Sequence, residues 1–217
     1  MTPDLLDQIL KSPRLKVIHD EIGQRLRTEQ IARQKFRDEM TEDTRAEFIN
    51  GEVVMHSPCR LEHNETAERI YLLLKLFVRR NQLGYVGHEK YLIELTRNDV
   101  EPDVMFWNTE KAAQFRKGQL IFPPPDLVVE VLSESTEYID RGTKFEDYAA
   151  HGVTEYWIVD PDKLVVEQYV LKGQSYELQF KSGNGTLKSA AIANGAFPVE
   201  AFFDDAADQA AVAAMGA

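Results

Sequence analysis

The stretch PPPDLVVEVLSEST, Pro123 to Thr136, places one acid, Glu130, inside an apolar run. A short run so rich in valine predicts a strand that is buried on both faces. A carboxylate in that position is costly unless another group pairs with it or binds it. The stretch therefore predicts a central strand of the sheet and, with it, a partner for Glu130.

The segments on either side of this strand alternate between strand and helix patterns. The pair Asn50-Gly51 predicts a hairpin in RAEFINGEVVMHS, and a helical period over 61–81 places His63 on an apolar face. Strands are expected in YVGHEKYLIEL, VEPDVMFW and EYWIVDP, and a helix is expected over 140–150. This order predicts an α/β fold with a mixed central β-sheet flanked by helices.

The chain has 217 residues, which fits one domain with appendages. Residues 1–40 are charged and helical in pattern, so we expect a helical N-terminal extension there. Residues 41–205 carry the strand and helix signals of the globular domain. Residues 206–217 are rich in alanine and are expected to form a flexible tail.

Composition restricts the class of protein. The net charge of −11 argues against nucleic-acid binding through bulk charge, although it permits a local basic groove. The single cysteine, Cys59, excludes an internal disulfide and favours a reducing compartment. No signal-peptide pattern and no run of roughly 18 apolar residues occurs. A cytoplasmic protein without a membrane partner is therefore expected.

Three polar residues stand beside the predicted strands. Asp103 begins one strand, Glu130 lies inside the next, and Lys144 lies on the helix that follows. Two acids on adjacent strands are suitable ligands for Mg²⁺ or Mn²⁺, and the carbonyl of Val131 can supply a third oxygen. A nearby lysine can orient a water molecule or balance charge on a phosphate. This set predicts a metal-dependent hydrolytic site.

The segments EPDV, PDLVVEVLSEST and DRGTKFEDYAAHGVTEYWIVDP resemble the Uma-type restriction endonuclease family, which belongs to the PD-(D/E)xK nuclease superfamily. The resemblance runs from about Glu47 to Asp160. It implies a restriction-endonuclease-like domain over 41–205 and DNA as the substrate. It also implies that Asp103 and Glu130 are the metal-binding acids.

The sequence departs from the superfamily motif at one position. The motif has a lysine two residues after the second acid, and this chain has Leu132 there. The resemblance suggests that Lys144 takes over the role of that lysine. Asp126 also matches the family pattern, but it lies about 13 Å along the strand from Glu130. It is therefore expected to be a helper at the rim.

Each of these residues also has a purely structural interpretation. Glu130 can form a salt bridge in the core, and Asp103 can simply begin a strand. Lys144 stands four residues after Asp140, which is a favourable helical pair. His63 on an apolar face is more typical of a core or capping histidine than of a ligand. Asp140 and His63 are therefore expected at most to support the site.

The leading hypothesis is a Mg²⁺- or Mn²⁺-dependent endonuclease that hydrolyses DNA phosphodiester bonds. A homodimer is expected, because cutting both strands favours two sites related by a two-fold axis. The alternative is a catalytically inactive nuclease-fold module that acts as an oligomeric partner-binding protein, which the net charge of −11 and Leu132 favour. A third hypothesis is a metal-dependent hydrolase of another phosphate ester.

Overall fold

The computed structural model describes residues 3–41 and 43–216. Its helices are α1 (Pro3–Lys11), α2 (Leu15–Glu39), α3 (Leu61–Arg80), α4 (Thr109–Ala112), α5 (Glu137–Asp140), α6 (Thr143–Ala150), the 3₁₀ helix η1 (Val199–Phe202) and α7 (Asp205–Gly216). Its strands are β1 (Ala46–Ile49), β2 (Glu52–Met55), β3 (Gly84–His88), β4 (Leu92–Glu94), β5 (Asp99–Val100), β6 (Val104–Asn108), β7 (Ile121–Phe122), β8 (Leu127–Val131), β9 (Glu155–Asp160), β10 (Val165–Lys172), β11 (Ser175–Ser182), β12 (Thr186–Lys188) and β13 (Ala196–Pro198).

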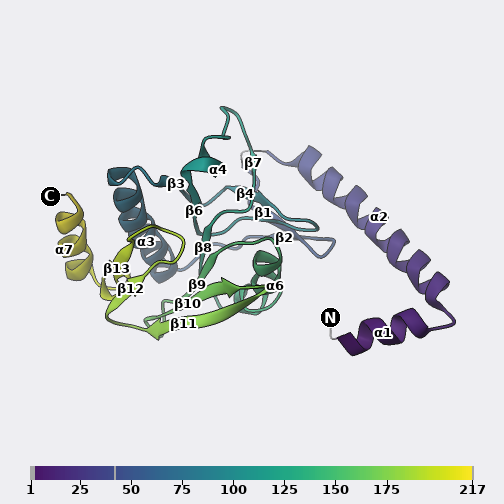
Figure 1. Cartoon of the computed structure of the whole chain (residues 1–217). Coiled ribbons are helices and arrows are strands. Elements are labelled where there is room, and N and C mark those ends of the chain that lie inside the picture. Colours follow the sequence, from purple (N-terminus) through teal and green to yellow (C-terminus); the bar gives the residue numbers. More distant parts are fainter. Residues whose placement is uncertain (1–2, 42, 217) are drawn as a thin grey trace.

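The central sheet has six strands in the order β11-β10-β9-β8-β6-β3 (Figure 1). Strand β8 runs parallel to β9 and antiparallel to β6, so the sheet is mixed. Every residue of β8 and β9 is buried, as the valine-rich pattern predicts for strands covered on both faces. The predicted fold class, a mixed sheet flanked by helices, is confirmed.

A second sheet has the order β2-β1-β5-β4-β7. Its first two strands form the hairpin predicted from the sequence, with Ile49 opposite Glu52. Asn50 and Gly51 have positive φ angles of 52° and 91°, as a tight hairpin turn requires. The hairpin carries one further acid, Glu47, which is buried on β1.

Two apolar layers cover the central sheet, and they explain where Glu130 points. Leu127, Val129 and Val131 pack with α3 residues in one layer, whereas Val128 packs with Tyr148 of α6 in the other. Side chains alternate between the two faces of a strand. Glu130 therefore faces the same side as Val128, toward α6, which carries Lys144.

The helix expected over 140–150 is shorter in the structure, where residues 143–150 form α6 and a separate short helix, α5, precedes it. Helix α5 ends at Asp140 and α6 begins at Thr143, with Arg141 and Gly142 between them. A Cβ atom on Gly142 would lie 2.8 Å from the carbonyl oxygen of Tyr138, so the chain passes too close for a larger residue. The apolar period does not reveal this break, because both short helices keep one face on the core.

The two ends of the chain differ from each other. Residues 206–217 are expected from the sequence to be a flexible tail, but residues 205–216 form helix α7, which packs on α3 and buries Ala211. Alanine is the strongest helix former, and this explains the correction. At the other end α1 and α2 are helical as predicted. The division into three parts at 40 and 205 stays a prediction.

No helix among the described residues is long and apolar enough to cross a bilayer.

Candidate active site

One cavity of about 510 Å³ brings together most of the residues that the sequence singles out. The side chains or backbone of six of them line it: His63, Asp103, Glu130, Val131, Asp140 and Lys144. The exception is Asp126, which is not among the lining residues. Its carboxylate instead accepts a hydrogen bond from the Asn108 N–H at 2.7 Å and pairs with Lys111 at 2.9 Å.

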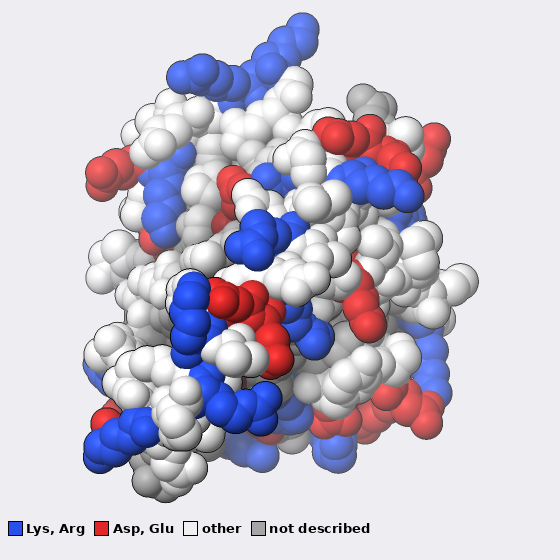
Figure 2. All heavy atoms as spheres, turned by 90° about the vertical axis from the view of Figure 1, so that its right-hand side faces the viewer, with Lys and Arg blue, Asp and Glu red and all other residues white. Residues whose placement is uncertain are grey.

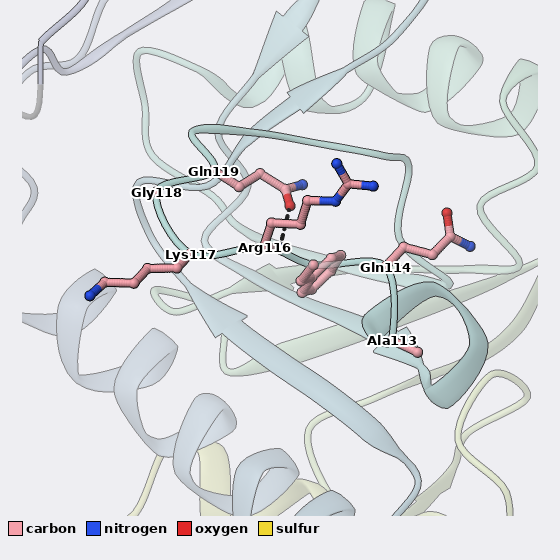
Figure 3. A pocket seen from close by; sticks show the side chains of 7 residues that line it. Ala113, Gln114, Arg116, Lys117, Gly118 and Gln119 are labelled. Carbon is pink, nitrogen blue, oxygen red and sulfur yellow. Dashed lines mark hydrogen bonds between the residues drawn. The ribbon is translucent and has the colours of Figure 1, made fainter.

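A second cavity, of about 580 Å³, is formed by one loop, Ala113–Gln119 (Figure 3). The Arg116 N–H donates to the Gln119 side chain at 3.0 Å, and the Arg116 and Lys117 side chains point away from each other. This lining contains no carboxylate and no histidine. Because it offers neither a carboxylate nor an imidazole for metal binding or proton transfer, the 510 Å³ cavity is the candidate site.

Asp103 is fixed at the ends of two adjacent strands. It directly precedes β6, and its Oδ2 accepts a hydrogen bond of 2.7 Å from the Val131 N–H at the end of β8. The Nε2 atom of His63 lies 3.4 Å from the same oxygen. Burial lowers the pKa of His63, but the carboxylate of Asp103 outweighs burial and raises it. The residues with which Asp103 interacts here come from β8 and α3.

Lys144 lies at the centre of three buried carboxyl groups. Its Nζ is 2.9 Å from Glu47, 3.0 Å from Glu130 and 3.4 Å from Asp140. The Tyr148 hydroxyl donates a further hydrogen bond of 2.8 Å to the Oε1 atom of Glu130. Lys144 on α6 and Glu130 on β8 are therefore in direct contact. The structural interpretations, a buried ion pair and the pair with Asp140, describe the same contacts.

The four charged groups have different protonation preferences. Burial raises the pKa values of Glu130 and Asp140 above their usual range. Burial acts the same way on Glu47, but the ammonium of Lys144 and the neighbouring His56 hold its pKa at about 2. Burial lowers the pKa of Lys144, and the three carboxyl groups more than reverse this. Lys144 therefore holds its proton, Glu47 is the carboxyl group that ionises most readily, and Glu130 and Asp140 hold their protons more tightly than exposed acids do.

Sequence reasoning missed three residues of the cavity wall: Glu47, His56 and Glu101. The Glu101 N–H donates to Glu47 at 2.7 Å, and His56 Nε2 lies 3.6 Å from the other oxygen of Glu47. Burial raises the pKa of Glu101 to about 7. A signal for Glu47 was present, because it lies in the apolar run AEFI just as Glu130 lies in LVVEV.

The donors around the cavity suit a hard divalent cation. Asp103 and Glu130 present carboxylate oxygens, and carboxylates outnumber the basic groups on the wall. Burial raises the pKa values of two of these carboxyl groups, Glu130 and Asp140, and an added cation beside them would lower both. Within residues 3–41 and 43–216, however, no three His, Cys, Asp or Glu side chains are already arranged as a metal site. A cation held here would thus need a non-side-chain ligand, such as the Val131 carbonyl, or a rearrangement of the carboxylates.

Comparisons with known proteins agree with this architecture. A crystal structure from Anabaena variabilis, described as "a putative nuclease belonging to DUF820", superposes with a TM-score of 0.67 over 78% of this chain and 96% of its own, at 16% identity. A protein of Synechocystis sp., described as "Uncharacterized protein sll1609", is 27% identical over 149 residues, 63% of this chain and 84% of its own.

The model of the Uma2 family, described as "Putative restriction endonuclease", matches residues 29–199. This range contains the whole cavity wall, from Glu47 on β1 to Asp162 after β9. It excludes α1 and the first half of α2. The chain therefore belongs to the Uma2 family.

Proposed function

We propose that this chain is a cytoplasmic, homodimeric endonuclease that uses Mg²⁺ or Mn²⁺ to hydrolyse DNA phosphodiester bonds. The observation that carries the proposal is the convergence of Asp103, Glu130 and Lys144 on one cavity of about 510 Å³. The family description supports a nuclease, and the oxygen donors support a hard cation.

Each residue has a role that follows from its surroundings. Asp103 and Glu130, with the Val131 carbonyl, would hold the cation. When bound, such an ion polarises a phosphoryl oxygen and makes water a better nucleophile. Lys144 keeps its proton because its pKa is raised, so it donates hydrogen bonds and does not act as a base. It would balance the charge that builds on the phosphate and hold Glu130 in place.

The raised pKa of Glu130 provides a direct test of metal binding. If a divalent cation enters the cavity, Glu130 must give up its proton, because carboxylates bind metals in the ionised form. Titration calorimetry of Mn²⁺ in two buffers of different ionisation enthalpy measures that release. We expect proton release in the wild type at pH 6 and a loss of both binding and release in Glu130→Gln. Glu177→Gln, an exposed acid on β11, is the control for bulk charge and should behave like the wild type.

Cleavage of supercoiled plasmid in the same samples tests the reaction. Asp103→Asn and Glu130→Gln should abolish cleavage together with metal binding. Lys144→Met should lose cleavage while it still binds Mn²⁺, because the lysine carries a positive charge and is no ligand. A wild type that binds no Mn²⁺, or cleavage that survives in Glu130→Gln, contradicts the proposal.

One observation favours the alternative, a catalytically inactive module that binds a partner. The ammonium of Lys144 already occupies the space between Glu47 and Glu130, where it neutralises the carboxylates without a metal. This alternative predicts no cleavage with any divalent cation and no proton release. A hydrolase of another phosphate ester would instead cleave bis(p-nitrophenyl) phosphate at a rate that excess DNA does not reduce.

A further inference from the structure

The N-terminal arm, residues 3–28, consists of α1 and the outer part of α2, and it projects from the body of the molecule. In Figure 1, α2 leads away from the sheets and α1 turns back at its far end. The arm precedes the range matched by the family model, which begins at residue 29. The arm is therefore an addition to the domain that the family shares, and the packing of its helices must be considered separately.

The inner part of α2, residues 29–39, is firmly attached to the body. Arg33 and Arg37 both donate to the fully buried carboxylate of Asp99, with N–O distances of 2.6–2.9 Å. Glu29 accepts two hydrogen bonds from Arg97, and the ring of Phe36 lies 6.0 Å from that of Phe48. These contacts fix the direction in which the outer part of the helix projects.

The face of α2 that docks on the body continues outward without a partner in the described structure. Glu29, Arg33 and Phe36 lie on this face, and positions 3, 7, 11 and 14 residues before Glu29 fall on the same face of a helix. These four positions are all apolar: Leu26, Ile22, Ile18 and Leu15. All but Ile18 are exposed. The apolar stripe therefore runs past the edge of the body.

Helix α1 adds to the uncovered apolar surface. It contacts α2, and its Leu5, Leu6 and Leu10 are exposed. With Leu15, Ile22 and Leu26, six half-exposed side chains supply on the order of 400 Å² of apolar surface. A stable interface of about 800 Å² per partner is roughly 57% apolar, which is about 450 Å². The arm thus has about the apolar area that one stable pairing requires.

Charge decides between the possible partners. Residues 1–40 carry eight Lys and Arg and seven Asp and Glu, so the rest of the chain carries a net charge of −12. Figure 2 shows this side of the molecule, where basic and acidic side chains are interspersed and no large patch of one sign forms. A nucleic acid would need a basic face, and two acidic bodies would repel each other. Two arms, each nearly neutral and apolar on one face, do not repel.

We infer that the arm is a dimerisation element, and that the stripe Leu15, Ile22 and Leu26 of one copy packs against the arm of a second copy. Such an isologous contact uses the same patch on both chains. The contact would also stabilise the outer turns of α2, which do not pack on the rest of the domain. Such stabilisation is needed because short helices are only marginally stable alone. This inference does not rest on the proposed nuclease activity.

Sedimentation velocity of the full chain between about 5 and 50 μM is the test. We expect the wild type to sediment as a dimer of the 24.8 kDa chain and Ile22→Asp/Leu26→Asp as a monomer. The matched control is Ile31→Asp. Ile31 is more exposed than Leu26, 71% against 44%, but it lies on the opposite side of α2 and should leave the dimer intact. A urea midpoint of the double variant close to that of the wild type would show that its body remains folded.

Three results would overturn the inference. The wild type could be monomeric throughout this range, which includes the case in which the arm folds back on its own body or lies against DNA. The dimer could persist in Ile22→Asp/Leu26→Asp, which would place the interface elsewhere. Ile31→Asp could dissociate the dimer as strongly as the double variant, and then the stripe would not be the contact. Metal binding and cleavage by the monomeric variant report separately on the nuclease site.

Discussion

Glu130 and Glu155 are both glutamates buried on adjacent parallel strands of the same sheet, yet their surroundings are opposite. Glu155 accepts hydrogen bonds from five neutral donors at 2.6–2.9 Å: Trp157, Gln168, Ser189, Ala190 and Ala191. Glu130 and two other carboxyl groups, those of Glu47 and Asp140, surround one lysine. Glu155 is paired completely by the protein itself. Glu130 instead lies at a cavity in which an added cation would stabilise the ionised carboxyl groups.

The difference shows that an acid in an apolar strand does not by itself identify a catalytic group. Burial is the same for both, since 3% of Glu130 and 0% of Glu155 is exposed. What differs is the type of partner. Fixed N–H and O–H donors occupy both carboxyl oxygens of Glu155 and leave no place for a ligand. Several titratable neighbours beside a cavity create groups with displaced pKa values, which cluster at functional sites.

The largest effect expected from this comparison is on activity. Glu130→Gln should reduce plasmid cleavage by at least about 10³-fold, which corresponds to about 4 kcal/mol in the activation free energy. The same change should alter the free energy of unfolding by less than about 1 kcal/mol. The reason is that the raised pKa already favours a neutral Glu130, which glutamine resembles. Cleavage assays and urea denaturation measure the two effects, and a large loss of stability would make Glu130 structural.

The second largest effect should fall on stability alone. Glu155→Ala leaves five buried donors without their acceptor, and we expect the free energy of unfolding to fall by about 3–4 kcal/mol. Glu155→Gln keeps one acceptor oxygen and should lose less. Urea denaturation gives these values, and Mn²⁺ affinity per folded molecule should not change. Loss of metal binding in the folded Glu155→Gln protein would remove the distinction between the two glutamates.

Lys144→Met should destabilise the protein by about 3 kcal/mol at pH 8, because buried carboxyl groups lose their cation. Without Lys144 the folded-state pKa values of Glu47, Glu130 and Asp140 should all lie above those of the unfolded chain. The folded form then binds more protons, so stability should fall as pH rises above about 4.5. Denaturation at pH 5 and pH 8 checks this, and Mn²⁺ should restore part of the loss at pH 8. A loss independent of pH would mean that Lys144 acts only through packing.

The smallest of the four effects concerns Glu101, whose pKa burial raises to about 7. Its folded-state pKa lies above the ordinary value of 4.5, so its contribution to stability is present below pH 4.5 and is lost as pH rises to 7. Glu101→Gln removes this dependence. Relative to the wild type, the variant should gain about 2 kcal/mol between pH 4 and pH 8. Denaturation of both proteins at pH 4 and pH 8 measures this gain. If the variant and the wild type differ in free energy of unfolding by the same amount at both pH values, the raised pKa of Glu101 is contradicted.

The sequence predicts the framework of the fold better than the details of the site. The valine-rich run around Glu130, the Asn50-Gly51 turn and the helical period of α3 each depend on local patterns that the structure reproduces. The break at Gly142 depends on a close approach to the Tyr138 carbonyl, and α7 depends on packing against α3. Both are tertiary effects that no local pattern contains.

The site was predictable only where the family resemblance or strand order brought residues together. Asp103 directly precedes β6, Glu130 lies on β8 and Lys144 lies on α6, and the structure places all three on one cavity. Glu47 contacts Lys144 from a different sheet, and a pass along the chain gives no reason to pair them. Which metal binds, and whether one does, stays a prediction.

The contact between Lys144 and Glu47 also bears on how the protein folds. It joins a hairpin near position 47 to a helix at position 144, and three strands of the central sheet, β3, β6 and β8, lie between them in the chain. Contacts between residues so distant in sequence form late, because closing a long loop costs entropy before the contact stabilises anything. The cavity would then be completed only in the last stage of folding. A partly folded or newly synthesised chain would have several strands of the domain without its assembled candidate site.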